Sequence, residues 1–83
     1  MQRKEIVVFK EEGLNPENCR QLVALCCNYS SSIMIRRGSV FINAKSLMGV
    51  LSLAAGKNSI LTFEADGKDE RRVLKAIETF LAE

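Results

Sequence analysis

Few side chains in this sequence could carry chemistry, and the most informative fact about them is an absence. The 83 residues include no histidine, which removes the commonest acid–base group, the commonest metal ligand and every phosphohistidine mechanism. The three cysteines, Cys19, Cys26 and Cys27, are an odd count, and two of them are adjacent. This arrangement suits neither a disulfide framework nor a spaced metal site. We therefore expect reduced, buried thiols, no metal and no cofactor.

Cys19 is the one thiol with a conceivable reactive role. Asn15, Pro16 and Glu17 are typical of a helix start, with Asn15 as the N-cap, and Cys19 falls about one turn into that helix. A helix N-terminus lowers the pKa of a thiol, and a thiolate is a nucleophile. The helical spacing of Cys19 with Cys26 favours the alternative, a buried structural thiol.

Ser46 stands where a polar segment runs into the apolar segment 47–53. A serine at such a junction predicts an N-cap, because its hydroxyl can accept a hydrogen bond from a free N–H of the first turn. The helix that follows is apolar on two sides: Val50, Leu53 and Ala54 share one, and Leu47, Met48 and Leu51 share the other. One apolar stripe suffices for the core. The second is therefore either covered by the chain's own helices or offered to a partner.

The elements that must position these residues follow from alternation, turn residues and helical spacing. The patterns predict strands over 2–9, 32–35, 40–43 and 60–65, with 36–39 as a hairpin turn. They predict helices from Pro16 to Asn28 or Tyr29, from Ser46 to a C-cap at Gly56, and from Asp69 onward. The order β-α-β-β-α-β-α predicts one α+β domain over residues 1–83, with a four-stranded, mostly antiparallel sheet covered on one face by three helices.

Composition excludes several classes of function. The net charge of +2, the single tyrosine and the lack of tryptophan argue against a nucleic-acid partner. No apolar run approaches the ~18–20 residues that a membrane helix needs, and no apolar region typical of a signal peptide precedes the first strand. We therefore expect a cytoplasmic protein without membrane insertion.

The segment Asn43–Leu53 closely resembles the regulatory-serine segment of the HPr family, the histidine-containing phosphocarriers of the bacterial sugar phosphotransferase system. Gly13 and Leu14 match the start of the family's active-site loop, and residues 66–70 match the turn before its last helix. The likeness covers essentially the whole chain in the same element order. It implies an HPr-like open-faced β-sandwich, in agreement with the predicted order of elements.

The active-site loop departs from the family pattern. After the glycine and an aliphatic residue, the family has a histidine, a small residue, an arginine and a proline; here those positions are Asn15, Pro16, Glu17 and Asn18. Asn15 has no nucleophilic ring nitrogen. Glu17 places a negative charge where a phosphoryl group would lie, a repulsion of about 4 kcal/mol per unit charge at ~4 Å and an effective dielectric of roughly 20. The degenerate loop implies that the chain is not an enzyme and does not transfer phosphohistidine.

The resemblance implies an interaction role instead. It implies that an HPr kinase phosphorylates Ser46, against the alternative that Ser46 is only a cap. It implies that Leu47, Met48 and Leu51 dock proteins of the phosphotransferase system or a transcription regulator, with Arg20 as the charged rim. The alternatives are that the chain itself covers this patch and that Arg20 is merely solvated. The expected function is a regulatory module; the competing hypotheses are a phosphocarrier using another nucleophile such as Cys19, or a decayed duplicate.

Overall fold

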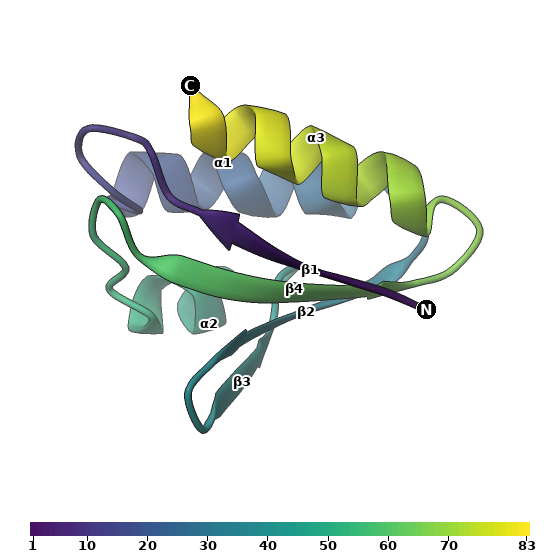
Figure 1. Cartoon of the computed structure of the whole chain (residues 1–83). Helices are drawn as coiled ribbons and strands as arrows, with labels where there is room; N and C mark the ends of the chain where they lie inside the picture. Colours follow the sequence, from purple (N-terminus) through teal and green to yellow (C-terminus); the bar gives the residue numbers. More distant parts are fainter.

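The computed structural model describes all 83 residues and confirms the predicted order of elements. The strands are β1 (Gln2–Val7), β2 (Ser32–Arg37), β3 (Val40–Asn43) and β4 (Ile60–Asp66), and the helices are α1 (Pro16–Cys27), α2 (Leu47–Ser52) and α3 (Glu70–Ala82). All strand pairs are antiparallel, in the order β1-β4-β2-β3. The molecule is thus an α+β open-faced sandwich with β4 and β2 at the centre of the sheet and β1 and β3 at its edges (Figure 1).

One face of the sheet is apolar because alternate residues of neighbouring strands are in register. Ile6 lies opposite Leu61, and Ile35 lies opposite Phe63; all four side chains are buried. Helices α1 and α3 run along this face, whereas the short α2 packs against α1 and β3 (Figure 1). The three helices and the sheet share one core cluster.

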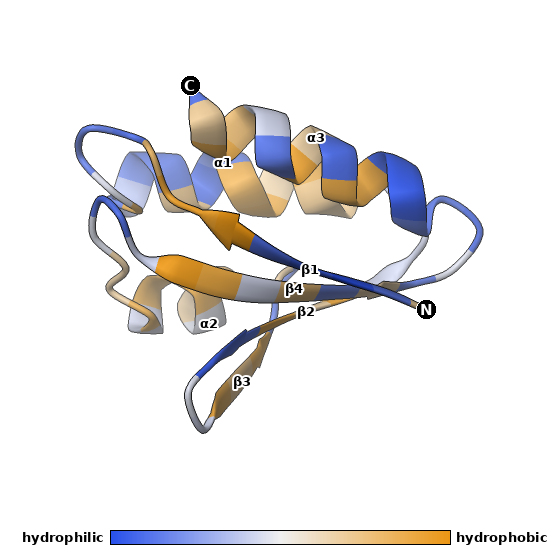
Figure 2. Ribbon diagram, viewed as in Figure 1, coloured by the Kyte–Doolittle hydropathy of each residue, from blue (hydrophilic) through white to orange (hydrophobic).

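The hydropathy of the elements follows this layering. In Figure 2 the first part of β4 and the end of β1 are apolar, whereas the start of β1 and the start of α3 are hydrophilic. The inner face of α3 buries Val73, Leu74, Ile77 and Leu81.

Several predicted boundaries are wrong. Arg36 and Arg37 belong to β2, because the hairpin closes with a tight turn at Gly38 and Ser39, where Gly38 has a φ of 61°. β1 ends at Val7 rather than at residue 9. α2 ends at Ser52, and the left-handed residue after it is Ala54, with a φ of 48°, rather than Gly56.

Asp69 precedes α3 as predicted, but its side chain does not cap that helix. Its carboxylate instead accepts hydrogen bonds from the backbone N–H groups of Ser30, at 2.9 Å, and Ser31, at 3.0 Å, and from the Ser31 hydroxyl. These bonds tie the connection after α1 to the start of α3.

Candidate functional site

The loop before α1 is held against the connection between α2 and β4. The backbone N–H of Leu14 donates to the carbonyl of Ala55 at 2.7 Å. Gly13 has a φ of 65°, and a Cβ added there would lie only 2.7 Å from Cα of Gly56. Only glycine fits this position without a shift of the backbone. The close approach fixes the start of α1 relative to the segment that follows α2.

Asn15, the residue that the resemblance aligns with the family's histidine, caps α1 as predicted. Its Oδ1 accepts a hydrogen bond from the backbone N–H of Asn18 at 2.8 Å. The Asn18 side chain donates in turn to the carbonyl of Gly13 at 2.7 Å. Asn15 thus serves the backbone of its own loop, and its side chain offers no atom that could take up a phosphoryl group.

Glu17 and Arg20, one turn apart on α1, form an ion pair. Gln21 also donates to the Glu17 carboxylate at 3.2 Å. The hydrogen bond and charge of Arg20 lower the pKa of Glu17, so this carboxylate is ionised at neutral pH. Both side chains are 58% exposed. Solvent and Arg20 therefore screen the repulsion toward a phosphoryl group further, and it falls below the roughly 4 kcal/mol expected at ~4 Å and an effective dielectric of about 20.

Cys19 is fully buried, and its thiol donates to the carbonyl of Leu14 at 3.3 Å. Burial raises the pKa of Cys19, because desolvation disfavours the charged thiolate. The burial of Cys19 favours the alternative of a structural thiol over a thiol activated by the helix N-terminus. Burial also raises the pKa of Cys26 to about 12. Cys27, expected to be buried, is exposed.

Ser46 is exposed and caps α2 as predicted, with its hydroxyl oxygen accepting from the N–H of Gly49 at 3.2 Å. The Ser46 N–H donates to the carbonyl of Asn43 at 3.0 Å. A Cβ at position 49 would lie 3.4 Å from the Ser46 hydroxyl oxygen, so the glycine keeps the surroundings of this hydroxyl open.

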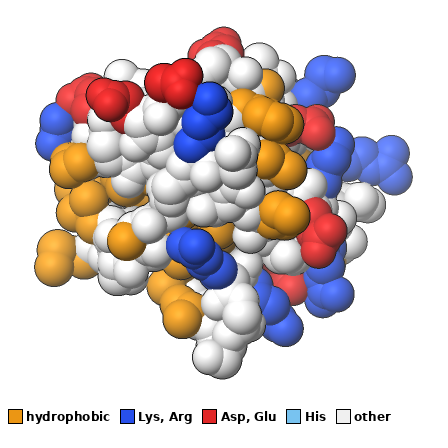
Figure 3. All heavy atoms as spheres, turned by 60° about the vertical axis from the view of Figure 1, so that its left-hand side comes forward, with side chains coloured by type: hydrophobic (Ala, Val, Ile, Leu, Met, Phe, Trp, Pro, Cys, Tyr) orange, Lys and Arg blue, Asp and Glu red, His pale blue; other side chains and the backbone are white.

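The two apolar sides of α2 have different environments. Val50 and Leu53 are buried, whereas Ala54, predicted on the same side, is exposed. On the other side Leu47 and Leu51 are each 37% exposed and Met48 is 79% exposed. Of this α2 patch (Leu47, Met48 and Leu51), the chain covers the two leucines in part and leaves Met48 largely exposed. Figure 3 shows apolar side chains grouped on the end of the molecule that carries this patch.

Packing of α1 against α2 brings the start of α1 and the α2 patch to the same end of the molecule (Figure 1). Two cations without an expected role donate hydrogen bonds to backbone carbonyls just after the ends of α1 and α2. Lys45 donates to the carbonyl of Tyr29, after α1, at 2.7 Å, and Arg37 donates to the carbonyl of Leu53, after α2, at 2.9 Å. Cations often bind the free carbonyls at a helix C-terminus. Lys45 and Arg37 are far in sequence from the carbonyls that they contact, so the sequence alone does not show which helix end each one binds.

The fold identifies the class of protein to which this chain belongs. The four-stranded antiparallel sheet with three helices is the fold of the small HPr phosphocarrier proteins, which are carriers rather than catalytic enzymes. The family model of the PTS HPr component phosphorylation site matches residues 2–83, and the chain belongs to the HPr family.

Relatives and solved structures agree with this assignment. The chain is 33% identical over 82 residues to the phosphocarrier protein HPr of Cupriavidus necator, covering 99% of this chain and 92% of that protein. It is 36% identical over 75 residues to the phosphocarrier protein HPr of Treponema pallidum, covering 90% and 85%. The HPr structure from Bacillus anthracis superimposes with a TM-score of 0.93 at 29% identity, covering 96% and 95%.

A structure of Crh, the catabolite repression containing protein of Bacillus subtilis, superimposes with a TM-score of 0.76 at 26% identity, covering 98% of this chain and 93% of that one. The family therefore includes relatives named for phosphate carriage and for catabolite repression. No helix of the present chain is long and apolar enough to cross a membrane.

Proposed function

We propose that this chain is a regulatory interaction module of the HPr family that does not carry phosphate on histidine. The observation that carries the proposal is the use of Asn15 as a helix cap at the family's acceptor position, in a chain without any histidine. The loop keeps the geometry of a helix start and lacks an acceptor atom. Crh supplies a family precedent for a role in catabolite repression.

The alternative of a carrier that uses Cys19 loses its physical support. A buried thiol with a raised pKa is a poor nucleophile and is inaccessible to a protein donor. The exposed Cys27 lies at the other end of α1 and is remote from the loop.

Ser46 is the proposed point of control, by a kinase of the HPr-kinase type. Its hydroxyl is exposed, and phosphorylation there would add nearly two negative charges next to the free N–H groups of the first turn of α2. The α2 patch begins at the next residue. A phosphate on Ser46 would therefore lie at the border of the proposed docking surface for phosphotransferase-system proteins or a transcription regulator, with Arg20 at its charged rim.

The acceptor test uses labelled phosphoenolpyruvate and the first enzyme of the phosphotransferase system. We expect no label on the native chain. The matched variant Asn15→His/Glu17→Arg restores the two family residues and should take up an acid-labile label, which shows that the assay works on this scaffold. An acid-labile or thiol-linked label on the native chain would refute the proposal.

The control test uses an HPr kinase and ATP, with mass spectrometry of the product. We expect one added phosphate on the native chain and none on Ser46→Ala. The docking surface is tested by an affinity pull-down with phosphotransferase-system proteins or the transcription regulator. The variant Met48→Asp should fold normally, because this side chain is largely exposed, and should no longer capture the partner. An unmodified Ser46 would remove the proposed control by this kinase, and unchanged capture by Met48→Asp would remove the α2 patch as the docking surface.

A further inference from the structure

A groove on a different part of the molecule has no role in the proposed function. β1 is an edge strand, and two adjoining hollows lie between it and α3. Arg3 and Lys4 of β1 line the first hollow together with Arg71 and Lys75 of α3. The second hollow is mostly apolar: Val7, Phe9 and Ala82 line it, and the carboxylates of Glu5 and Glu78 lie at its border. Glu78 lines both, so the two form one β1–α3 groove with a basic end and an apolar end.

The basic end carries cations that the free chain does not neutralise. Lys4 pairs with Glu78 at 2.9 Å and Arg3 pairs with Glu64 at 3.0 Å, but Arg71 and Lys75 have no carboxylate within 4.0 Å. Arg71 and Lys75 are four residues apart on α3, where like charges repel. They also lie in the first two turns, near the positive end of the helix dipole. This end of the groove would therefore attract an anionic ligand.

The backbone of β1 provides the second observation. The Val8 N–H donates to the carbonyl of Ser59 at 2.9 Å, so the backbone N–H of Val8 points toward the segment that leads into β4. Residues alternate along an antiparallel ladder. The N–H and C=O groups of Arg3, Glu5 and Val7 therefore point away from β4, toward the free edge. Such an edge can pair with an extended segment of another chain.

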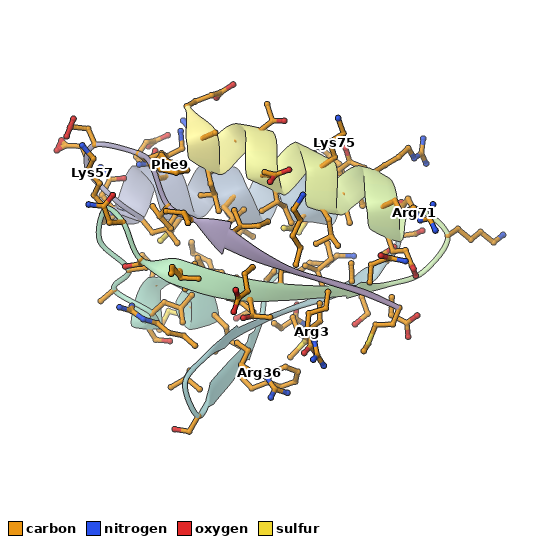
Figure 4. The ribbon with its side chains drawn as sticks, in the orientation of Figure 1. Arg3, Phe9, Arg36, Lys57, Arg71 and Lys75 are labelled. Carbon is orange, nitrogen blue, oxygen red and sulfur yellow. The ribbon has the colours of Figure 1, made fainter.

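The cations flank this edge from both sides. Figure 4 shows Arg71 and Lys75 on α3 and Arg3 on the opposite side of the sheet, with β1 between them. Side chains of an added strand alternate between these two sides. Acidic side chains at neighbouring positions would therefore meet Arg3 on one side and the α3 cations on the other.

We propose that the free edge of β1 binds an extended segment of a protein partner as a fifth strand, with acidic residues at the Arg71 and Lys75 end and apolar residues at the Val7 and Phe9 end. Charge complementarity selects this occupant. A second copy of the chain paired antiparallel at the same edge would place Val7 and Phe9, rather than carboxylates, opposite the cations. A small anion would satisfy the cations but leave the strand edge and the 55% exposed Phe9 uncovered.

The test titrates the full chain with a synthetic peptide of about eight residues. One half of the peptide is Glu-rich and the other half is rich in Val and Phe, and both orders of the two halves are made. Binding is followed by amide chemical shifts and fluorescence anisotropy. We expect shifts at Arg3, Glu5 and Val7, saturable binding of one order of the halves, and loss of binding when alternate peptide N–H groups are methylated.

The matched variants are Lys75→Glu and Arg72→Glu. Both side chains are exposed on α3 and both changes reverse one charge, but only Lys75 lines the groove. We expect Lys75→Glu to weaken binding roughly tenfold or more and Arg72→Glu to weaken it much less. Three outcomes would overturn the proposal: equal effects of the two variants, undiminished binding of the methylated peptide, or self-association through β1 that the peptide does not compete with.

Discussion

The contact between Gly13 and Gly56 allows a quantitative test of how the loop before α1 is positioned. The perturbation is Gly13→Ala, and the control is Gly38→Ala. Both glycines have left-handed backbones, with φ of 65° and 61°. Adding a Cβ in this conformation costs roughly 1–2 kcal/mol at either position. Gly38 has no heavy atom within 4 Å of an added Cβ, so its substitution should cost this amount and no more.

At Gly13 the added Cβ would lie 2.7 Å from Cα of Gly56 and 2.8 Å from the carbonyl oxygen of Ala55. Both distances are shorter than real Cβ contacts, and both neighbours are backbone atoms. Relief requires the two loops to separate, which breaks the hydrogen bond between Leu14 and Ala55 and leaves polar groups unpaired, at a further cost of about 1–3 kcal/mol. We therefore expect Gly13→Ala to lower the free energy of unfolding by roughly 2–5 kcal/mol.

The assay is urea unfolding of both variants and the native chain at neutral pH, with the denaturant slopes compared to confirm that the unfolded states are equivalent. Losses that agree within about 0.5 kcal/mol for the two variants would refute the reasoning, because only the left-handed backbone would then matter. Native-like stability of Gly13→Ala would show that the two loops are not in contact.

Three further predictions concern stability and reactivity. The Ser31 hydroxyl and adjacent backbone donors lower the pKa of Asp69 from 3.8 to about 2, so its contribution to stability is complete above the ordinary value and is lost as the pH falls toward the lowered one. Urea midpoints measured across this pH range should show the loss, and Ser31→Ala should flatten it; an unchanged acid dependence in that variant would contradict the assigned cause. Iodoacetamide should modify Cys27 in the native protein and leave Cys19 unmodified, as peptide mass spectrometry would show, and equal labelling rates would contradict the burial of Cys19. Ser46→Ala should destabilise the fold by about 1 kcal/mol through loss of the cap, whereas Ser46→Asp should retain most of it; equal thermal stability of all three proteins would exclude a capping role.

Local signals in the sequence were sufficient for much of the fold. Asn15 and Ser46 cap their helices as predicted, because capping depends on a side chain and the next turn only. The position of the left-handed residue after α2 does not follow from residue type, because packing of the following loop determines where the helix ends. Gly56 was the obvious candidate by residue type, yet Ala54 adopts that conformation.

Long-range partners limited the prediction of the site. Asp69 accepts from residues almost forty positions earlier, and no local pattern indicates such a contact. For Cys19 two local arguments conflicted, because helical spacing indicated burial and the nearby helix start indicated reactivity. The side of α1 that meets the sheet decides between them, and only the tertiary structure shows it. The exposure of Met48 depends in the same way on what packs against α2.

The order of the strands in the sheet also determines when the domain can fold during synthesis. β4 is the partner of both β1 and β2, and it ends at Asp66. While a ribosome is still adding the preceding residues, the nascent chain can form α1 and the β2–β3 hairpin but has no template for its first strand. Folding of the domain therefore waits until β4 has been synthesised, and β1 emerges long before its neighbour in the sheet exists.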